Sequence, residues 1–302
     1  METPPETRLD LWLAAPARCE SVQHLAESWR DVECHLTLAP VAPADSAFGA
    51  HLRGSFLAAL GPGASDQARQ RRPCPWEPPC ALDIFLREHL RKGGDGLPKP
   101  YVLFWQQEGP AMQVTLRLFG AACDWGPAAF EAMVAALRAL PWQKALSCDP
   151  PRLLHREVVT APWIDLPDAP LTLTLLSPMD DEGTADKGRD LAARLLSRAL
   201  RRVDALARWQ GLALQDDAVS ALTAQAHAVT ARDLRVTPGR HFSPNVRGET
   251  RISKVLSGQI DLPPLSDDLR LVLALALRVH LGRHTNEGLG RCAAQPTARN
   301  AG

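Results

Sequence analysis

Hydrophobic positions alternate in some segments of this chain and recur with a helical period in others. The alternation predicts half-buried strands at 8–15 and 33–39. Apolar residues three and four apart predict a helix over 46–60, with its large side chains near one face. The Gly- and Pro-rich segment 61–80 separates this helix from the next pattern and predicts a loop.

The same reasoning applies to the rest of the chain. It predicts paired strands at 100–107 and 112–120, a helix at 126–141, strands at 153–160 and 171–177, a long helix from about 185 to 210, a shorter helix near 216–230, a hairpin over 247–262 and a buried helix at 266–279. Strands and helices mix in both halves, which predicts an α+β protein of two units. We expect one domain at 1–148 and a second at 149–302.

Composition places the chain among globular proteins. Its 302 residues, 45% of them hydrophobic, allow two domains with separate cores. No apolar run reaches the length of a membrane span, and the N-terminus lacks the pattern of a secretion signal. Seven cysteines, an odd number without regular pairing, favour a reducing compartment over a disulfide framework. We therefore expect a cytoplasmic protein with no membrane partner.

The formal net charge of zero conceals an uneven distribution of charge. From Asp186 to the end there are 18 Lys and Arg against 11 Asp and Glu, a net charge of about +7. A basic second half favours an anionic partner. The alternative is that the many arginines reflect a GC-rich genome, which the bias toward Ala, Arg, Pro and Leu also fits.

The predicted long helix has its cations on one side. At 100° per residue, five of them fall within about 40° of one line: Lys187, Arg194, Arg198, Arg201 and Arg208. The apolar residues occupy the other side: Ala192, Leu195, Leu196, Ala199, Leu200, Val203 and Leu206. Such a helix buries one face and offers phosphates a row of cations on the other. A simple solvated face is the alternative.

A glycine-rich stretch, "HLGRHTNEGLGRC" at 280–292, follows the last apolar helix. Glycines remove side chains where a backbone could approach phosphates, and arginines supply positive charge. The residues expected to contact a nucleic acid here are Gly282, Arg283, Gly288, Gly290 and Arg291. Their spacing fits neither a dinucleotide fingerprint nor a Walker loop.

Several segments in fixed order resemble the CRISPR-associated precursor-RNA processing endoribonucleases of the RAMP superfamily. The segments are "HLRGSFLAAL" (51–60), "LPKPYVLF" (97–104), "VTLRLFGAA" (114–122), "RHFSPNVRGETRISKVLSGQIDL" (240–262) and "VHLGRHTNEGLGRC" (279–292). The last is similar to the C-terminal glycine loop that characterises this superfamily and is the most specific of the five.

The resemblance implies two ferredoxin-like (RRM-like) domains in tandem, with catalytic residues in the first and RNA-binding residues in the second. It also implies metal-independent cleavage of a CRISPR repeat RNA, with no cofactor, and contacts to RNA from Arg240 and Arg247. The expected partners are a crRNA stem-loop and other subunits of a CRISPR effector complex. A non-catalytic RNA-binding subunit, a specialised type IV-like relative and a globular protein unrelated to RNA remain alternatives.

Metal-free RNA cleavage needs a base for the 2′-OH, an acid for the 5′-oxygen and a cation for the phosphorane. Histidine suits both proton roles. His51 lies where the resemblance places a catalytic histidine, at the start of the first helix, and Arg53 follows as a phosphate stabiliser. His284 is an alternative proton donor, and His241 a weaker one. An exposed or capping role is the alternative for His51.

The chain departs from the family in one respect. Relatives usually pair the histidine with a tyrosine or lysine, whereas the only tyrosine here, Tyr101, lies in a predicted strand and is expected to pack. An arginine-dependent site therefore stays open. Cys74 and Cys80 have no histidine beside them, so we expect no zinc site, and no cluster of acids indicates a two-metal nuclease.

Aromatic residues are few, and those near predicted strands are expected in the core rather than under bases: Trp12, Trp105 and Trp125. This favours recognition of a stem-loop by shape and phosphate contacts over stacking of single-stranded bases.

Overall fold

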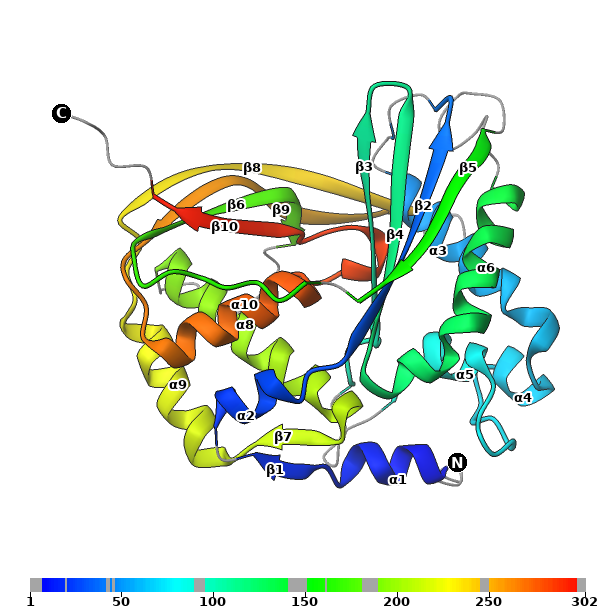
Figure 1. Ribbon diagram of the computed structural model, residues 1–302, viewed down its shortest axis with the longest axis horizontal. Helices are drawn as coiled ribbons and strands as arrows, with labels where there is room; N and C mark the ends of the chain where they lie inside the picture. The colour runs from blue at the N-terminus through cyan, green and yellow to red at the C-terminus, as the bar shows by residue number, and fades with distance from the viewer. Residues whose placement is uncertain are drawn as a thin grey trace. The chain divides into compact units, whose positions relative to one another are not determined.

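The structure is a computed structural model that describes residues 7–19, 21–41, 44, 47–89, 96–140, 151–160, 162–180, 190–244 and 250–297 (Figure 1). The chain divides into two compact units. Unit 1 comprises Met1–Ala17, Trp29–Ala161 and Ala205–Leu212, and unit 2 comprises Arg18–Ser28, Pro162–Asp204 and Ala213–Gly302.

Unit 1 contains a β-α-β-β-α-β series. Its elements are β2 (Asp31–Ala39), α3 (Phe48–Ala59), β3 (Tyr101–Glu108), β4 (Ala111–Phe119), α6 (Gly126–Ala139) and β5 (Arg152–Val159). The strands form an antiparallel sheet in the order β3-β4-β2-β5, the topology of a ferredoxin-like domain. Shorter helices accompany it: α1 (Arg8–Ala14), α4 (Asp66–Arg69), α5 (Ala81–Leu86) and 3-10 turns at Gly61–Gly63, Gly120–Trp125 and Arg208–Gln210.

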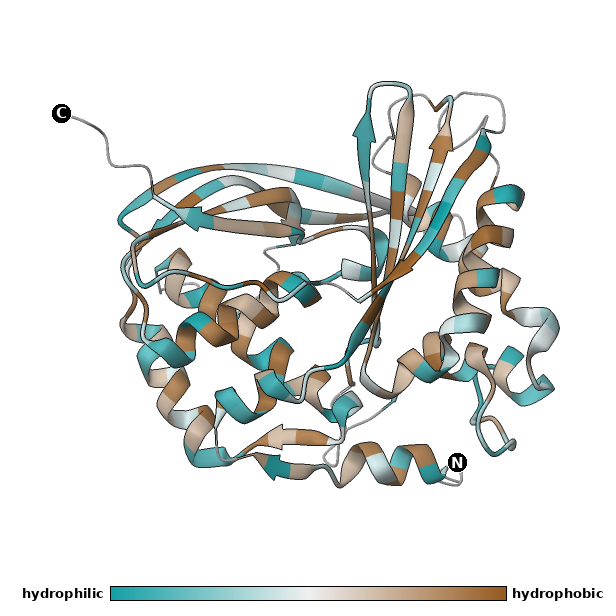
Figure 2. Cartoon of the chain, in the orientation of Figure 1, coloured by the Kyte–Doolittle hydropathy of each residue, from teal (hydrophilic) through white to brown (hydrophobic). Residues whose placement is uncertain are grey.

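The helices of unit 1 form because their apolar residues share one face. In α3 the side chains of Phe48, Leu52 and Phe56 are fully buried, and α3 packs beside α6. Tyr101 at the start of β3 is fully buried against Phe56, as predicted. The strands show alternating brown and teal bands in Figure 2, as expected for strands with one covered face.

Unit 2 repeats the same series. Its elements are β6 (Leu171–Asp180), α8 (Leu191–Ala207, ending in unit 1), β8 (Asp233–Pro244), β9 (Thr250–Leu262), α10 (Asp267–Val279) and β10 (Cys292–Pro296). The antiparallel sheet has the order β10-β6-β9-β8, again ferredoxin-like. Further elements are α2 (Val22–Glu27), α9 (Asp216–Ala228), a 3-10 turn at Thr285–Glu287, and the paired short strands β1 (Ala17–Cys19) and β7 (Leu212–Leu214).

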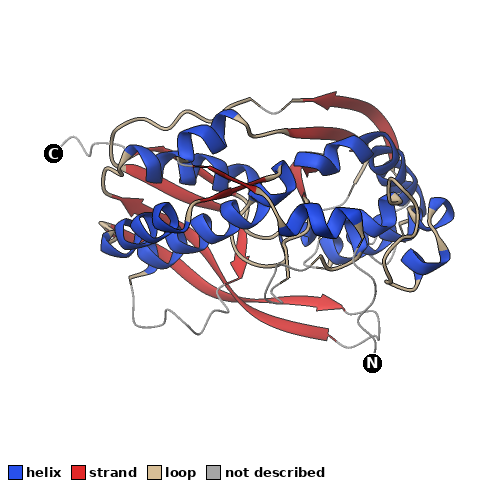
Figure 3. Ribbon diagram, turned by 90° about the horizontal axis from the view of Figure 1, so that it is seen from below, coloured by secondary structure: helices blue, strands red, loops and turns tan. Residues whose placement is uncertain are grey.

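The helices of unit 2 lie on one side of its sheet (Figure 3). The apolar face predicted for α8 is confirmed, since its seven residues from Ala192 to Leu206 named above are all buried. Helix α10 begins at Ser266, whose hydroxyl accepts from the Leu269 N–H, and two acids in its first turn favour that end. The two units confirm the predicted α+β class with tandem ferredoxin-like domains. Among the described residues, no helix is both long and apolar enough to cross a membrane.

Three local predictions are wrong. The segment 61–80, predicted as a loop, contains the short helix α4, which Ser65 caps by accepting from the Ala68 N–H. Residues 8–15 form helix α1 rather than a strand, because Thr7 and Asp10 make reciprocal hydrogen bonds that cap a helix. A hairpin was predicted over 247–262, but the described part of that segment, Thr250–Leu262, is the single strand β9, which pairs with β8. Gly258 marks a close approach rather than a turn, since a Cβ there would lie 2.1 Å from the Arg235 carbonyl oxygen.

The units also differ from the expected division at 148/149. Strand β5 pairs with β2 as the fourth strand of the first sheet, so unit 1 continues to Ala161. The segment Ala205–Leu212 also packs into unit 1, where the Trp209 indole donates to the Pro98 carbonyl oxygen at 3.2 Å. Gly120 makes room for it, because a Cβ there would lie 2.0 Å from the Trp209 oxygen. Neither pairing is encoded in local periodicity.

Candidate nucleic-acid interface

The glycine loop of unit 2, residues 280–291, connects α10 to β10 and folds back on itself. The Leu281 N–H donates to the Gly290 carbonyl oxygen at 2.8 Å, and the Gly290 N–H donates to Pro178 at 2.9 Å. The loop is thus fastened to the end of β6. It presents Arg283 to solvent and leaves Arg291 half-buried.

The three glycines serve the fold of this loop directly. All have positive φ, at 84° for Gly282, 89° for Gly288 and 72° for Gly290. A Cβ on Gly290 would lie 1.7 Å from the Leu281 oxygen, and one on Gly282 would lie 3.1 Å from the Asp180 oxygen. The glycines therefore allow a close backbone approach within the protein itself, and the predicted approach to phosphates stays a prediction. Gly288 and Gly290 are buried.

A polar cluster lies beneath the loop. The His284 ring has Nε2 3.7 Å from Asp180 Oδ2 and Nδ1 3.5 Å from Glu287 Oε2. Both carboxylates are almost completely buried. His241 on β8 is also buried, and burial lowers its pKa, with Glu287 and Asp180 opposing the shift. The His284 ring therefore lies between two buried carboxylates, with only 14% of its side chain exposed.

Arg202, which the sequence analysis did not single out, reaches the loop from α8. Its Nε donates to the Val279 oxygen at 2.9 Å and its Nη2 to Thr285 Oγ1 at 2.6 Å. Arg202 lies on the same helix as the predicted cationic row, but its side chain points in a different direction on the helical wheel. A helical wheel could not have shown its partners.

The predicted row of exposed cations on α8 is corrected by the structure. Within α8 only Arg201 is exposed, while Arg194 and Arg198 are half-buried. Arg198 Nη1 lies 3.4 Å from the Asp180 oxygen. Arg208 belongs to the following 3-10 turn in unit 1, where it donates to the Leu13 oxygen at 3.2 Å. The long arginine stems fold against neighbouring segments, which periodicity alone does not reveal.

The β8–β9 ribbon carries two cations that the sheet does not neutralise. Arg240 and Lys254 lie directly opposite each other in the register, and both are exposed. Neither makes an ion pair with any residue that the structure describes. Like charges directly across a sheet are destabilising unless an anion lies between them. Among the described residues, β6 pairs with β9 as far as Val255, so β8 is the described neighbour of β9 at Lys254.

In unit 1, His51 lies in the first turn of α3. Its side chain is half-buried, and its imidazole makes no hydrogen bond or ion pair within the described part of the chain. Arg53 is also half-buried, but two residues along a helix differ by about 200°. The two side chains therefore leave α3 on opposite sides of its buried face, and the helix itself does not bring them together.

Lys99 is a second residue that the sequence analysis missed, although it lies in the noted segment "LPKPYVLF". Its ammonium donates to the oxygens of Leu86 and Arg87 at 2.7 and 2.5 Å, which satisfies the end of α5. Burial lowers the pKa of Lys99 to about 8; Glu88 opposes this, and the positive charge of Arg53 adds to it. Arg53 thus lies in a cationic neighbourhood.

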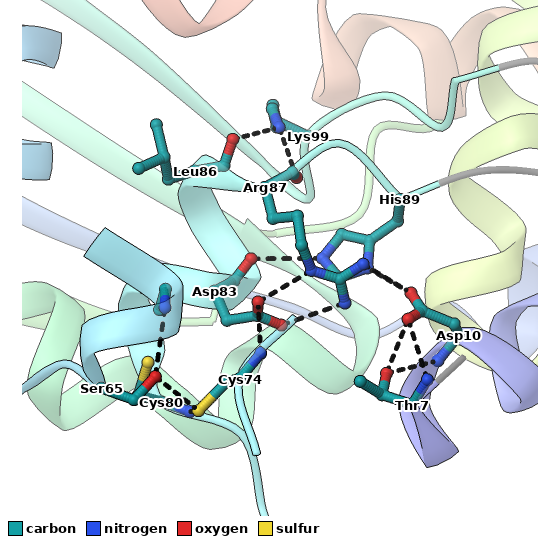
Figure 4. A network of polar contacts seen from close by, with 11 residues as sticks. Thr7, Asp10, Ser65, Cys74, Cys80, Asp83, Leu86, Arg87, His89 and Lys99 are labelled. Atoms are coloured by element: carbon teal, nitrogen blue, oxygen red, sulfur yellow. Dashed lines mark hydrogen bonds and ion pairs between the residues drawn. The ribbon is translucent and has the colours of Figure 1, made fainter. Parts of the chain in front are cut away.

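Figure 4 shows a network of polar contacts within unit 1. Asp83 is fully buried and accepts from Arg87 at 2.7 and 3.1 Å. Arg87 and His89 both reach Asp10 at 3.0 Å. Burial alone would raise the pKa of Asp10, but hydrogen bonds from His89, Thr7 and Arg87 hold it well below its usual range. The network joins α1 to α5 and explains why His89 is not a candidate for catalysis.

The described residues offer no group of three or more His, Cys, Asp or Glu placed to hold a metal ion. All six described cysteines are free thiols. Cys74 accepts from Ser65 Oγ at 3.3 Å and from the Cys80 N–H at 3.4 Å. These two cysteines belong to the same buried network (Figure 4).

Aromatic side chains lie both in the core and on the surface, where Trp76 and Trp163 are 50% and 44% exposed. Trp105 packs edge-on against Phe48, and the Trp125 indole donates to the Pro79 oxygen at 2.8 Å. Trp12 lies on α1 rather than in a strand and is 40% exposed.

Two predicted RNA contacts, Lys187 and Arg247, lie outside the described residues.

No family model matches the sequence, and neither does any curated protein. Solved structures do match. A Cas6 product complex has a TM-score of 0.53 at 19% identity, covering 87% of this chain and 99% of the other. Cas6 of Thermus thermophilus has a TM-score of 0.52 at 16% identity, with coverage of 88% and 99%. A RAMP protein binding different RNA substrates has a TM-score of 0.50 at 12% identity, covering 87% of this chain and 99% of the other. The chain therefore has the fold of the Cas6 and RAMP proteins, which confirms at the level of the fold the resemblance that its motifs indicate.

Proposed function

We propose that this protein binds the repeat RNA of a CRISPR transcript and cleaves it within the repeat without a metal ion. The observation that carries RNA binding is the opposed, exposed pair Arg240 and Lys254 on the β8–β9 ribbon, which no carboxylate of the described chain neutralises. Phosphates satisfy such a pair. Neighbours with this fold include Cas6 product and substrate mimic complexes, which support an RNA ligand.

The proposed chemistry is attack of the RNA's own 2′-OH on the adjacent phosphate. The 2′-oxygen forms a bond to phosphorus, the bond to the 5′-oxygen breaks, and the products are a 2′,3′-cyclic phosphate and a 5′-hydroxyl. His51 is the group we propose for proton transfer, since its imidazole is accessible and not held by the described residues. Arg53, in its cationic neighbourhood, is the proposed phosphate contact.

Unit 2 supplies RNA contacts in this proposal. Arg240, Lys254, Arg201 and Arg283 are exposed and suited to phosphates. The half-buried arginines of α8 and its following turn stabilise the protein instead. We prefer His51 to His284 for proton transfer because the His284 ring is enclosed between two buried carboxylates and its side chain is only 14% exposed. We further propose that the RNA contacted is a stem-loop and that the product is retained for other subunits of a CRISPR complex.

A second candidate function is a non-catalytic subunit that holds crRNA. One observation favours it: the only tyrosine is fully buried in the core of unit 1 and cannot assist His51. This candidate shares the RNA-binding surface and differs only in the absence of chemistry.

Incubation of the full chain with labelled repeat RNA in EDTA separates these functions. We expect one cut within the repeat and a 2′,3′-cyclic phosphate on the upstream product, detected by its resistance to enzymes that need a free 3′-hydroxyl. Binding without a cut would establish the non-catalytic subunit instead. Absence of salt-sensitive RNA binding would overturn both.

Replacing both Arg240 and Lys254 with alanine should weaken RNA binding at every repeat sequence tested. Because each residue neutralises about one phosphate, the slope of log affinity against log salt should fall by about two. Filter binding at four salt concentrations measures both quantities.

Arg235→Ala is the matched control, since it removes a cation from the same strand. Its guanidinium is already held by Asp261 at 2.9 Å and by Asp233 at 3.1 Å. The control should leave the salt slope unchanged. An equal slope for the double variant and the wild type would remove the ribbon from the RNA interface.

A further inference from the structure

One side chain connects the two ends of the first half of the glycine loop. Val279 is the last residue of α10, and Thr285 is the first residue of the 3-10 turn. Arg202 donates to the Val279 oxygen at 2.9 Å and to Thr285 Oγ1 at 2.6 Å. Its planar guanidinium therefore donates to both ends of residues 280–284 at once and fixes the distance between Val279 and Thr285.

The five residues between these anchors have an unusual backbone. His280 has φ 60° and ψ 161°, and His284 has φ 57° and ψ 25°. A residue with a side chain adopts such angles only where the surroundings impose them. The anchoring by Arg202 is one such constraint, and the hydrogen bond between Leu281 and Gly290 is another.

Arg283 lies between the two anchors and is exposed, while Arg202 is half-buried and bound to both anchors. Burial lowers the pKa of Arg202 to about 10, so the guanidinium keeps its charge and all its donors at neutral pH. The direction in which Arg283 projects therefore depends on the backbone that Arg202 holds.

We infer that Arg202 is a positioning residue for the RNA contact of the glycine loop. It touches no RNA; it fixes Val279 and Thr285 so that Arg283 is presented to a phosphate. This role rests on the proposed RNA binding and extends it to a half-buried residue of α8 that does not contact the RNA.

A double-mutant cycle between the loop anchor and Arg283 tests the inference. Thr285→Val removes the hydroxyl that accepts from Arg202 while keeping the shape of the side chain. We expect Arg283→Ala to weaken repeat RNA binding about tenfold, as for one charged hydrogen bond. Thr285→Val should weaken it to a similar extent. The double variant should bind no more weakly than Arg283→Ala alone, because a displaced Arg283 has no contact left to lose.

Three further variants distinguish positioning from general destabilisation. Thr285→Ser keeps the hydroxyl and should bind like the wild type. Arg202→Gln should behave like Thr285→Val in the cycle. Arg18→Gln is the matched control, since Arg18 also belongs to unit 2 and donates to a backbone oxygen, that of Leu214 at 2.7 Å. It should leave the effect of Arg283→Ala unchanged.

Each result has a definite consequence. If the effects of Thr285→Val and Arg283→Ala are additive, Arg202 does not position Arg283. The same conclusion follows if Thr285→Ser loses as much binding as Thr285→Val. Either result overturns the positioning role and leaves the proposed RNA binding standing. A wild-type protein with no affinity for repeat RNA overturns the proposed function and this role together. Melting temperatures of all variants show whether a weak binder is folded.

Discussion

Replacing His51 with alanine is expected to slow cleavage of repeat RNA by a hundred- to ten-thousandfold, the usual contribution of one proton-transfer group. The histidine lies in the first turn of α3, half-buried, with no hydrogen bond to its imidazole among the described residues. Its ring is thus available to exchange a proton with the RNA, and its loss should leave the packing of α3 on Phe48 and Leu52 intact. Single-turnover rates in EDTA measure the effect.

RNA affinity should change little in the same variant, because the phosphate contacts proposed for unit 2 remain. His227→Ala provides a matched control, since His227 is a half-buried histidine on another helix, α9, with no proposed role. Cleavage by His51→Ala at the wild-type rate would remove this residue from the mechanism. It would leave an arginine-dependent site, centred on Arg53, as the remaining hypothesis.

Replacing Asp83 with alanine should lower the free energy of unfolding of unit 1 by about 3 kcal/mol. Asp83 is fully buried and is bound by two nitrogens of Arg87 and by the Cys74 N–H at 3.1 Å. Without it, the Arg87 guanidinium keeps Asp10 as a partner but loses two hydrogen bonds. The expected loss is therefore at the lower end of the range for breaking a buried ion pair. Urea unfolding followed by tryptophan fluorescence measures it.

The control for Asp83 is Asp66→Ala, which breaks an ion pair with Arg69 at 3.0 Å. Asp66 is 83% exposed, and solvent screening limits such surface pairs to about 0–1 kcal/mol. Equal losses for the two substitutions would mean that the network in Figure 4 does not stabilise unit 1. A large loss for Asp83 alone would assign the segment 61–89 a structural role, separate from RNA binding.

The likeness to Cas6 and RAMP structures is a likeness of fold, and it covers nearly nine-tenths of this chain. At 12–19% identity, side-chain roles do not follow from that likeness. The proposed roles therefore depend on this chain's own geometry: an accessible histidine at the start of α3, an unneutralised pair on the ribbon, and a loop anchored from within by Arg202.

Local sequence determined most elements of this protein. Helices α3, α6 and α10 follow from apolar residues three and four apart, and the hairpin of β3 and β4 follows from alternation on either side of Glu108, Gly109 and Pro110. Five motif segments, taken together, also indicated the fold. These patterns are local, and each helix or strand buries its own apolar face whatever its final neighbours are.

Tertiary structure alone decided which strands and which charges meet. The pairing of β5 with β2 and the return of Ala205–Leu212 to unit 1 join residues more than a hundred positions apart, which no local period encodes. The contacts of the arginine side chains were also decided by the tertiary structure. A helical wheel gives the direction of each side chain, but only the packed fold shows that Arg202 meets Thr285 while Arg240 faces Lys254 and solvent. Long cationic side chains reach well beyond their own helix or strand, so their partners are a property of the fold.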